Sequence, residues 1–388
     1  MKKIIIISIF IAGIIFVGNF IFFHISIQKS NKNIAENFAE AKKIYDAIPV
    51  WHKKIKTDQI LKIGIITDTH VRPNRINKND GLEKKESPRY LKEKYTRPLR
   101  NFVAQMNTFQ PEYVIHGGDI VEGTGDPDWL CFMGIDFVDQ ELQKIHVPIY
   151  YVLGNHELRC ITKAQFREKI GIKDQKQVID TGDYRFVIID GNFHPEGDPE
   201  PGPTGHRYIP GFVQKEDLEW LKEQLSTEKR TFVFIHQGPF LDSTVGDEGK
   251  KKQSIGNAQE LRDILDEYRV DGIFNGHMEA RRYEKTRFTE YYSFTGTKKS
   301  KAYPESYYEL TITGGDPDVT MYYVPQGTTN IKRVDFESCE NDVIYTNDSK
   351  KESMNSVGKN DSKGFKQNII VEVVKTLAKE GSGLAEKF

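Results

Sequence analysis

Five short motifs between residues 68 and 279 combine carboxylate, amide and imidazole side chains, the groups that bind divalent cations. In chain order they are Asp68-Thr69-His70, Gly118-Asp119, Gly154-Asn155-His156-Glu157, the isolated His236, and Gly276-His277-Met278-Glu279. Each alone is weak evidence, because Gly-Asp sequences also make ordinary turns and buried histidines are often only hydrogen-bonded. Together they offer enough ligands for two adjacent ions, and a pair of ions suits phosphate ester chemistry.

The elements that must position these motifs are short strands, because each motif begins where a predicted strand ends. The carboxyl ends of parallel strands open onto one crevice, so distant motifs can converge there. The strands concerned are predicted over residues 62–67, 113–116, 148–153, 231–235 and 270–275.

Helical periodicity alternates with these strands, which predicts βαβ crossovers and a largely parallel core. The helical stretches lie near residues 99–109, 129–145, 218–225 and 261–268. A late run of short strands, near 291–295, 307–313 and 319–324, suggests a second, more antiparallel sheet. The expected fold class is therefore α/β, a two-sheet sandwich flanked by helices.

The N-terminus carries an apolar run over residues 4–23, directly after Lys2 and Lys3. At ~1.5 Å rise per residue the run reaches ~30 Å, the hydrocarbon thickness of a bilayer, which predicts a transmembrane helix. Bulky residues close the run at 20–23 and no small-residue cleavage signal follows, so an uncleaved signal anchor is favoured over a secreted, cleaved form. The two lysines place the short end inside and the remaining chain outside the cytoplasm.

Composition suggests four regions: a signal anchor at 1–29, a stalk at 30–60, a folded domain at 61–325, and a polar tail at 326–388. The tail is expected to be disordered, because it offers too little apolar surface to bury. The net charge of −1 gives no basic excess, so no nucleic-acid partner is expected. The three cysteines show no disulfide framework, and Cys160 is interpreted as a small buried apolar residue.

The ordered motifs resemble those of the calcineurin-like metallophosphoesterase family over about residues 62–324. The resemblance implies a four-layer sandwich with a two-metal site at the strand ends. It also implies that Asp68 and His70 bind the first metal and that Asp119 bridges both. Asn155, His236 and His277 would complete the second, and His156 would face the substrate without binding metal.

One position departs from the family pattern, because Glu279 stands where the family's Gly-His-x-His motif usually has its second histidine. A glutamate can still bind a hard ion through oxygen. With Asp68 and Asp119 it gives three anionic ligands, so among Mn, Fe, Mg and Zn we expect two divalent ions with Mn²⁺ favoured. In the alternative, Glu279 points away and pairs with Arg281 or Arg282.

The resulting hypothesis is a metal-dependent phosphoesterase outside the cytoplasm, which hydrolyses a phosphate mono- or diester with a hydroxide held by two metals. His156, as a protonated imidazole, would protonate the leaving group or stabilise the charge that grows on it. The partners would be the membrane and a phosphorylated small-molecule or lipid substrate. Arg159, His206 and Arg207 could hold the substrate, or simply be solvated. The alternative function is a non-catalytic metal- or ligand-binding envelope protein on a degenerate site.

Overall fold

The computed structural model describes residues 48–73, 93–197, 211–241, 253–297, 303–337 and 344–346. Contacts within the chain separate a compact unit, Val50–Asn347, from a second unit composed of Met1–Pro49 and Asp348–Phe388. The second unit lies almost wholly outside the described residues, so the predicted anchor at 1–29, most of the stalk and most of the tail lie outside them too. Within the described ranges, no helix is long and apolar enough to cross a membrane.

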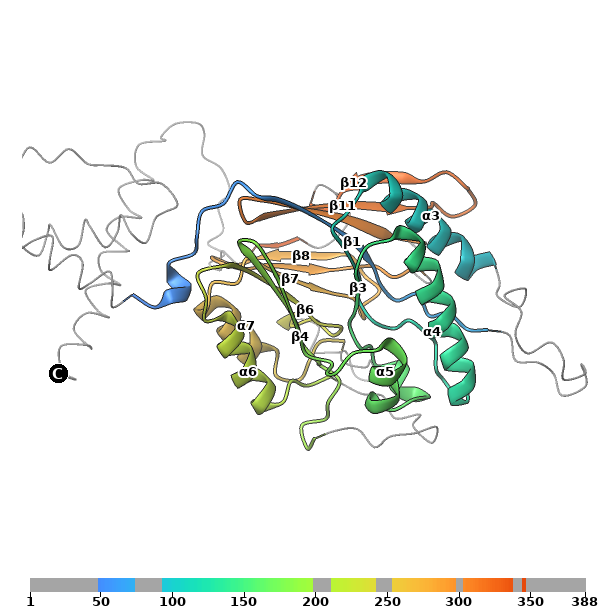
Figure 1. The fold of residues 1–388 in the computed structure, drawn as a ribbon, viewed down its shortest axis with the longest axis horizontal. Helices are drawn as coiled ribbons and strands as arrows, with labels where there is room; N and C mark the ends of the chain where they lie inside the picture. The colour runs from blue at the N-terminus through green and yellow to red at the C-terminus, as the bar shows by residue number, and fades with distance from the viewer. Residues whose placement is uncertain are drawn as a thin grey trace, which may run out of the picture. The chain divides into compact units, whose positions relative to one another are not determined.

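The compact unit is built on two β-sheets (Figure 1). The first sheet has the strand order β12-β11-β10-β1-β2-β3. Its strands are β1 (Ile60–Ile66), β2 (Tyr113–His116), β3 (Ile149–Tyr151), β10 (Tyr307–Thr313), β11 (Asp316–Tyr323) and β12 (Lys332–Asp335). The second has the order β13-β8-β9-β7-β6-β5-β4. Its strands are β4 (Gln177–Thr181), β5 (Tyr184–Ile188), β6 (Arg230–Phe234), β7 (Gly272–Asn275), β8 (Arg282–Lys285), β9 (Glu290–Ser293) and β13 (Ile344–Thr346).

Both sheets are mixed rather than one parallel and one antiparallel. In the first, β1, β2 and β3 are parallel, while β10, β11 and β12 continue the sheet antiparallel from the other side of β1. In the second, β5, β6, β7 and β9 are parallel, with antiparallel β4 beside β5 and antiparallel β8 beside β9. The prediction that the late strands form their own sheet is wrong, because they pair with open strand edges of both sheets.

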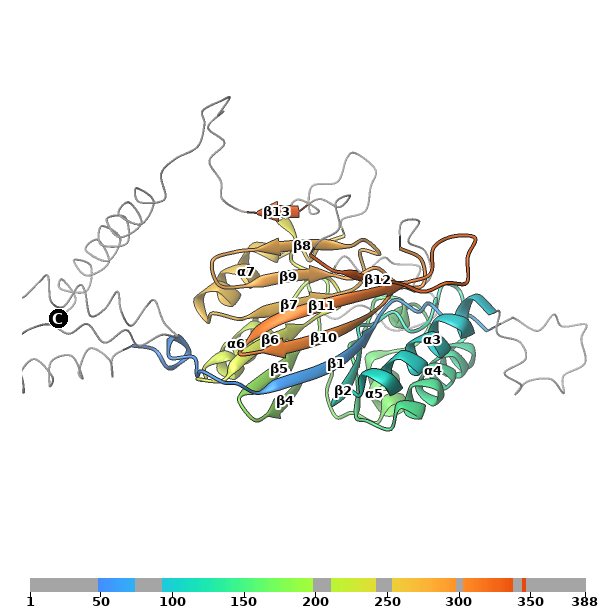
Figure 2. The ribbon, with the colours of Figure 1, turned by 90° about the horizontal axis from the view of Figure 1, so that it is seen from above.

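Helices cover the outer face of each sheet, which gives four layers (Figures 1 and 2). Helices α3, α4 and α5 pack on the first sheet, and α6 and α7 pack on the second. Their bounds are α3 (Glu93–Phe109), α4 (Asp128–Leu142), α5 (Lys163–Ile170), α6 (Lys215–Leu225) and α7 (Ala258–Glu267), with short 3-10 helices η1 (Val50–His52), η4 (Gln143–Ile145) and η5 (Glu157–Arg159). The predicted two-sheet sandwich flanked by helices is therefore confirmed.

Alternation along the strands explains the layering. Leu61, Ile63 and Ile65 of β1 point into the core between the sheets, whereas Ile66 joins the outer core beneath α3 and α4. Because successive side chains of a strand face opposite sides, one strand serves both cores. Each fully buried side chain of this size stabilises the fold by about 1.5–3 kcal/mol, so the strand ends that carry the site rest on a rigid base.

A disulfide joins Cys131 of α4 to Cys160, which follows η5. The interpretation of Cys160 as a plain buried apolar residue is therefore wrong, although both side chains are indeed buried. The two cysteines are 29 residues apart in sequence, yet their Cα atoms lie 6.5 Å apart because α4 packs against the segment after β3. Sequence spacing did not reveal this approach.

Candidate metal centre

The five motifs occupy the same edge of the two sheets. Asp68 follows β1, Asp119 follows β2, and Asn155 and His156 follow β3 in the first sheet. In the second sheet His236 follows β6 and His277 follows β7. All five strands run parallel to a neighbour within this set, so their carboxyl ends point the same way.

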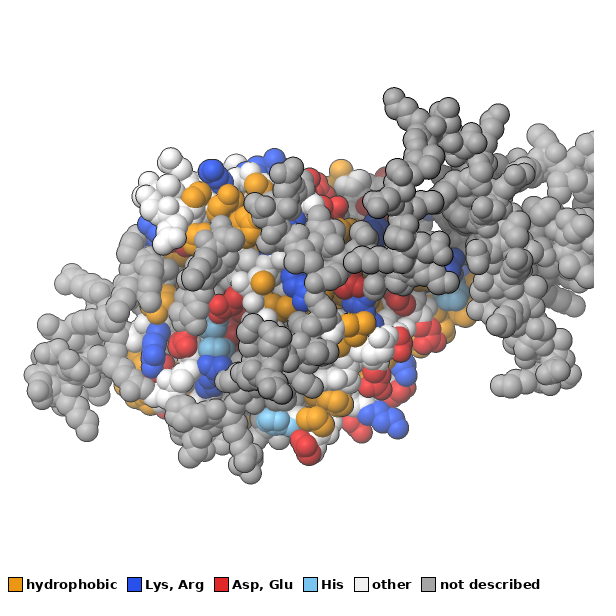
Figure 3. Space-filling view, turned by 180° about the vertical axis from the view of Figure 1, so that it is seen from behind, with side chains coloured by type: hydrophobic (Ala, Val, Ile, Leu, Met, Phe, Trp, Pro, Cys, Tyr) orange, Lys and Arg blue, Asp and Glu red, His pale blue; other side chains and the backbone are white. Residues whose placement is uncertain are grey.

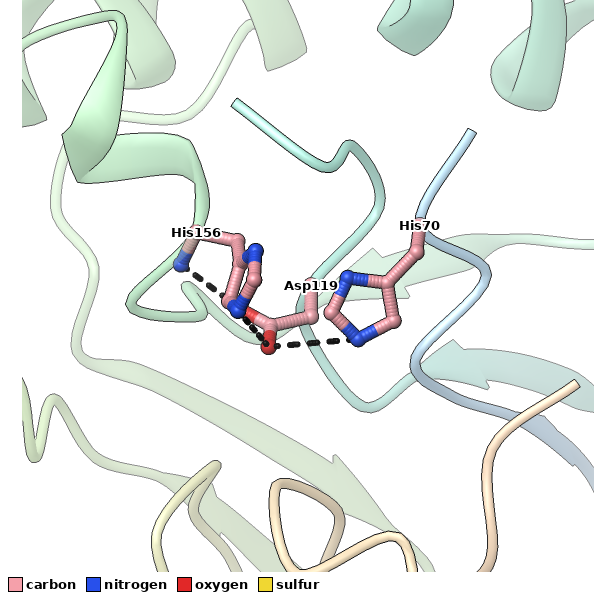
Figure 4. A group of neighbouring side chains, drawn as sticks. All are labelled: His70, Asp119 and His156. Carbon is pink, nitrogen blue, oxygen red and sulfur yellow. Dashed lines mark hydrogen bonds and ion pairs between the residues drawn. The ribbon is translucent and has the colours of Figure 1, made fainter. Parts of the chain in front are cut away.

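Asp119 lies at the centre of the site. Its Oδ2 atom is 3.2 Å from Nε2 of His236, 3.7 Å from Nε2 of His70 and 3.8 Å from Nε2 of His156. Figure 4 shows the His70 and His156 rings on either side of this carboxylate, each with a ring nitrogen turned toward it. One carboxylate thus reaches histidines from both sheets.

Three overlapping groups of side chains could each hold a cation, since within each group the ligand atoms all lie within 4.8 Å of one another. The groups are Asp68, His70 and Glu279; His70, Asp119 and His156; and Asp119, His236 and His277. Asp119 and His70 each belong to two of these groups. The arrangement fits two neighbouring ion positions with Asp119 between them.

A buried ligand oxygen without a hydrogen bond supports a fit to metal. Oδ1 of Asn155 is buried and has no hydrogen-bond partner among the described residues, whereas the buried Nε2 atoms of His70 and His236 lie 3.1 and 3.2 Å from the carboxylates of Glu279 and Asp119. An unsatisfied buried polar atom costs roughly 1–3 kcal/mol. A cation bound to the Asn155 oxygen would remove that penalty, and the two imidazoles with their facing carboxylates would supply other ligands of the two ion positions.

Glu279 points into the site. Its Oε1 atom lies 3.1 Å from Nε2 of His70, so the carboxylate occupies the place that the family pattern gives to histidine. Two other oxygen ligands, from Asp68 and Asp119, lie 3.8 and 3.7 Å from the same nitrogen. The position around His70 is therefore rich in oxygen.

Backbone strain concentrates on the ligands. Among the described residues, nine positions other than glycine have positive φ, and five of them belong to the site: Asp68, His70, Asp119, His277 and Glu279. Left-handed backbone costs L-residues of order 1–3 kcal/mol and persists where the surrounding structure enforces it, commonly at functional sites. Glu279 shares this property with four of the six ligands that the family pattern predicts.

The glycines of the motifs are required by close approach. A Cβ atom on Gly154 would lie 2.2 Å from the Asp119 backbone nitrogen, and one on Gly276 would lie 2.3 Å from Oδ2 of Asp68. Each glycine thus lies against a ligand from a different motif. Only a residue without a side chain lets the strand ends come this close.

A profile of calcineurin-like phosphoesterases matches residues 61–278, more than half of the chain and every proposed ligand except Glu279. The chain belongs to the calcineurin-like phosphoesterase family. Membership and the ligand clusters together support a phosphoesterase hydrolase with a site for two divalent ions.

Two solved structures are similar to this chain at low identity. A dimetal phosphatase from Danio rerio is 16% identical, with a TM-score of 0.52, and the match covers 74% of this chain and 99% of that one. A purple acid phosphatase from yellow lupin is 13% identical with a TM-score of 0.44, over 72% of this chain and 54% of that one. The first likeness shows the fold alone and the second is too distant to add to it. No curated protein sequence matches the chain.

Glu157 holds the loops of the site together, a role that the sequence analysis did not assign to it. Its buried carboxylate accepts backbone N–H groups from Asp119 (3.2 Å), Val121 (3.1 Å) and Gly154 (2.9 Å). It therefore fastens the loop after β2 to the loop after β3. Burial raises the pKa of Glu157 to about 7, while the donated hydrogen bonds act in the opposite direction. In the sequence, this residue is the last member of the Gly154-Asn155-His156-Glu157 motif.

The electrostatics of the metal-free site centre on one ion pair. Burial would lower the pKa of His236, but the Asp119 carboxylate beside it raises that pKa to about 10. Conversely, burial would raise the pKa of Asp119, and His236 and its neighbours hold it well below the usual value. Nδ1 of His236 bonds to the Gly117 carbonyl oxygen at 2.8 Å, so Nε2 faces Asp119. In the metal-free protein, a proton on Nε2 stands where a cation would bind.

His156 and Arg159 lie side by side at the rim. Nδ1 of His156 donates to the Glu122 carbonyl oxygen at 2.7 Å, and Nη1 of Arg159 donates to Oγ1 of Thr124 at 2.7 Å. The guanidinium also lies 3.0 Å from Nδ1 of His156. Burial lowers the pKa of His156 to about 4, with the Arg159 charge adding to the effect. The ring is therefore neutral at neutral pH.

The site reaches solvent at this rim. The side chains of His156, Glu122 and Glu279 remain 13%, 15% and 26% exposed. Figure 3 shows histidine atoms at the surface between acidic and basic side chains. The other two predicted substrate residues, His206 and Arg207, lie outside the described residues.

Proposed function

We propose that this chain is a metal-dependent phosphoesterase that hydrolyses a phosphate mono- or diester outside the cytoplasm. The observation that carries the proposal is the position of Asp119, whose carboxylate faces ligand histidines from both sheets. Two ions held there would supply the positive charge that activates water and neutralises phosphoryl oxygens. Asp68, His70, Asp119 and Glu279 would hold one, and Asp119, Asn155, His236 and His277 the other.

His156 is the proposed proton-transfer residue. Its Nδ1–H is committed to the Glu122 carbonyl, so Nε2 carries the lone pair that faces the site. Because its pKa is lowered to about 4, the ring does not bring a proton with it at neutral pH. It would instead take up a proton at Nε2 from solvent at the rim and pass that proton to the leaving oxygen. The sequence-based hypothesis had used an imidazole that is already protonated.

Mn²⁺ is the favoured ion in this proposal. The position around His70 offers carboxylates from Asp68, Asp119 and Glu279 and a single imidazole. Carboxylate-rich sites suit Mn²⁺ and Mg²⁺ better than Zn²⁺, which imidazole and thiolate favour. Arg159, half-buried beside His156, is placed to pair with a substrate oxygen. The substrate would be a phosphorylated small molecule or a lipid headgroup.

Two observations support a location outside the cytoplasm. The buried Cys131–Cys160 disulfide is a bond that persists in oxidising compartments and is rare in reducing ones. The apolar run at residues 4–23, although outside the described residues, matches a signal anchor by composition. N-terminal sequencing of the membrane-fraction protein tests this part. A mature chain beginning near residue 25 would refute the anchor, and a fully cytoplasmic protein with both thiols free would refute the location.

A substrate panel tests the activity. The purified chain, freed of metal by chelation, is assayed on an aryl phosphate monoester and diester before and after Mn²⁺ is added. We expect turnover to return with Mn²⁺ and to remain absent in Asp119→Asn. Two bound ions without turnover on either ester would favour the alternative, a non-catalytic binding protein. That alternative drew its support from the departure from the family motif at Glu279, whose carboxylate nevertheless faces His70.

A further inference from the structure

A network of buried polar side chains lies beside the metal centre and takes no part in the proposed chemistry. Part of it follows β5, whose carboxyl end shares the edge of the site because β5 runs parallel to β6. Its members are Lys163, Asp190, Asn192 and Gln237, and the last three are at most 4% exposed. Buried polar groups require hydrogen-bond partners, so the bonds of this network fix where each side chain lies.

Asn192 links the two sheets. Its Nδ2 atom donates to the Leu153 carbonyl oxygen at 2.7 Å, just beyond β3 of the first sheet. Its Oδ1 atom accepts from Nε2 of Gln237 at 2.7 Å, just beyond β6 of the second sheet. Leu153 comes two residues before Asn155, and Gln237 directly follows His236. One side chain therefore connects the segments that carry two proposed metal ligands.

Neighbouring groups determine the orientation of the Asn192 amide. The Leu153 carbonyl oxygen can only accept, so the atom that faces it must be the donor Nδ2. The same Nδ2 atom donates to Oδ1 of Asp190 at 3.1 Å, and the Asn192 backbone N–H donates to that oxygen at 2.8 Å. A flip of the amide would break the bonds to both Leu153 and Asp190. Oδ1 of Asn192 is therefore left to accept from Gln237.

The backbone that carries Asn192 is held in place. Oδ2 of Asp190 lies 2.8 Å from Nζ of Lys163, at the start of α5. The Ile189 N–H donates to the Phe234 carbonyl oxygen at 3.0 Å, which continues the pairing of β5 with β6. A link that is fixed at this end sets how far apart the segments after β3 and β6 lie.

The proposed ligands on either side of this link belong to one metal position but to different sheets. Metal–ligand distances vary by only about 0.2 Å, so the separation of the two segments decides whether Asn155 and His236 can bind one ion. Oδ1 of Asn155 has no hydrogen-bond partner among the described residues that could orient it. Its backbone must position it, and the bond from Asn192 to Leu153 holds that backbone.

We propose that Asn192 is a positioning residue that sets the separation between Asn155 and His236, and so completes the metal position that these two ligands share. The inference rests on the proposed function, because it takes both residues as ligands of one ion. It extends that function to a residue that, in the described part of the chain, belongs to none of the groups that could hold a metal. Loss of the Asn192 amide should weaken that position and spare the one at His70.

The test is titration of the metal-free, full-length chain with Mn²⁺, followed by calorimetry and by electron paramagnetic resonance. Two Mn²⁺ ions ~3.5–4 Å apart that share a carboxylate couple magnetically, so the spectrum reports their spacing. A single bound ion gives an uncoupled spectrum. Asn192→Leu removes both links at nearly constant volume. Gln237→Met removes only the link to β6, and the double variant combines the two.

The control is Asn257→Leu, the same substitution at another asparagine that joins two segments. Nδ2 of Asn257 donates to the Val213 carbonyl oxygen at 2.9 Å, and its Oδ1 atom accepts from the Val213 N–H at 3.1 Å. Neither residue is adjacent in sequence to a proposed ligand. Thermal unfolding of each metal-free variant verifies that it is folded.

We expect Asn192→Leu to bind one of two Mn²⁺ ions about 10–100-fold more weakly, the usual cost of losing a residue that orients a ligand. At the Mn²⁺ concentration that fills the wild type, its spectrum should be that of a single ion. Gln237→Met should weaken the same ion to a smaller degree. The double variant should be no worse than Asn192→Leu alone, because both changes remove one link. Asn257→Leu should bind both ions and give the coupled spectrum.

Wild-type affinity for both ions and an unchanged coupled spectrum in Asn192→Leu would overturn the proposal. So would an equal loss in Asn257→Leu, or fully additive losses in the double variant, since either would indicate general destabilisation rather than one link. If Asn192→Leu does not fold, wild-type binding and coupling in Gln237→Met would overturn it in the same way. A wild type that binds two coupled ions but hydrolyses neither aryl ester would contradict the proposed activity and leave this comparison intact.

Discussion

The Glu279 Oε1 atom lies 3.1 Å from the Nε2 atom of His70, where both can contact one cation. This contact is what distinguishes the site from the usual family pattern, in which both ligands are histidines. A carboxylate oxygen is a harder ligand than an imidazole nitrogen, and it also adds a negative charge. The choice of metal should therefore depend on this residue.

Substitution of Glu279 should change metal preference at one position. Glu279→Ala is expected to weaken the binding of one Mn²⁺ ion by at least about tenfold, because it removes an anionic ligand. Glu279→His should restore binding but favour Zn²⁺ over Mn²⁺. Competition between the two ions, followed by elemental analysis, measures this. Identical Mn²⁺/Zn²⁺ ratios in the wild type and both variants would show that Glu279 is not a ligand.

Asp119→Asn should lower occupancy at both metal positions together. The substitution keeps the size of the side chain but removes the charge that faces His70 and His236. Metal content per chain, measured after equilibration at limiting Mn²⁺, is expected to fall toward zero rather than to one. Retention of one fully occupied ion would contradict a shared carboxylate.

His156→Ala should retain both metals but reduce turnover by roughly 10²–10⁴-fold, the range for acid–base groups. The metals should remain because the backbone N–H of residue 156, which donates to Oδ1 of Asp119 at 2.8 Å, survives the substitution. Steady-state assays on the best aryl ester, with metal content measured in parallel, test this. Wild-type turnover would remove His156 from the mechanism.

Metal binding should release protons at neutral pH. The pKa of His236 is raised to about 10, because Asp119 outweighs the effect of burial, so Nε2 is protonated until a cation displaces the proton. Since that pKa lies above the unfolded value of about 6.5, the Asp119 ion pair stabilises the metal-free fold fully below pH ~6.5. That stabilisation is lost as pH rises toward 10, while Mn²⁺ affinity should rise over the same window.

Calorimetry at pH 7 in buffers with different ionisation enthalpies measures the release. We expect metal binding to release about one proton per chain, from His236. Asp119→Asn should reduce the number of protons released. A binding enthalpy that is the same in every buffer would show that metal binding does not release a proton from His236.

Loss of the disulfide should destabilise the fold around His156. The bond spans 29 positions, and closing a loop of about 30 residues is worth about 3–4 kcal/mol in the chain-entropy description. Cys131→Ala with Cys160→Ala should lower the free energy of unfolding in urea by about this amount. Reductant should lower it in the wild type and leave the double variant unchanged. Equal stability with and without reductant would show that the bond does not form.

The predicted ligands could be found from the sequence because each is recognised from its residue type and from the few residues before it. A ligand's chemistry is fixed by residue type, and a short β-branched run before Asp68 or His236 is enough to place each at a strand end. The rule that parallel strand ends share one edge then brings them together without further detail. The same local reasoning predicted helices over both sheets and a sandwich.

Other features depended on approach between segments distant in sequence. The Cys131–Cys160 bond exists because α4 packs against the segment after β3, and no spacing rule encodes that contact. Glu157 fastens two loops through three backbone N–H groups, whose positions follow from the loops' conformations rather than from their residue types. The late strands joined both sheets because edge pairing is chosen among all available edges.

The sequence by itself determined which atoms could bind metal and that strands deliver them to one edge, since residue type and periodicity are properties of short segments. Only the tertiary structure decided that Glu279 turns toward His70 and that Asn192 links the segments after β3 and β6. The direction of a side chain is set by the packing and backbone strain around it, and those arise when both sheets meet.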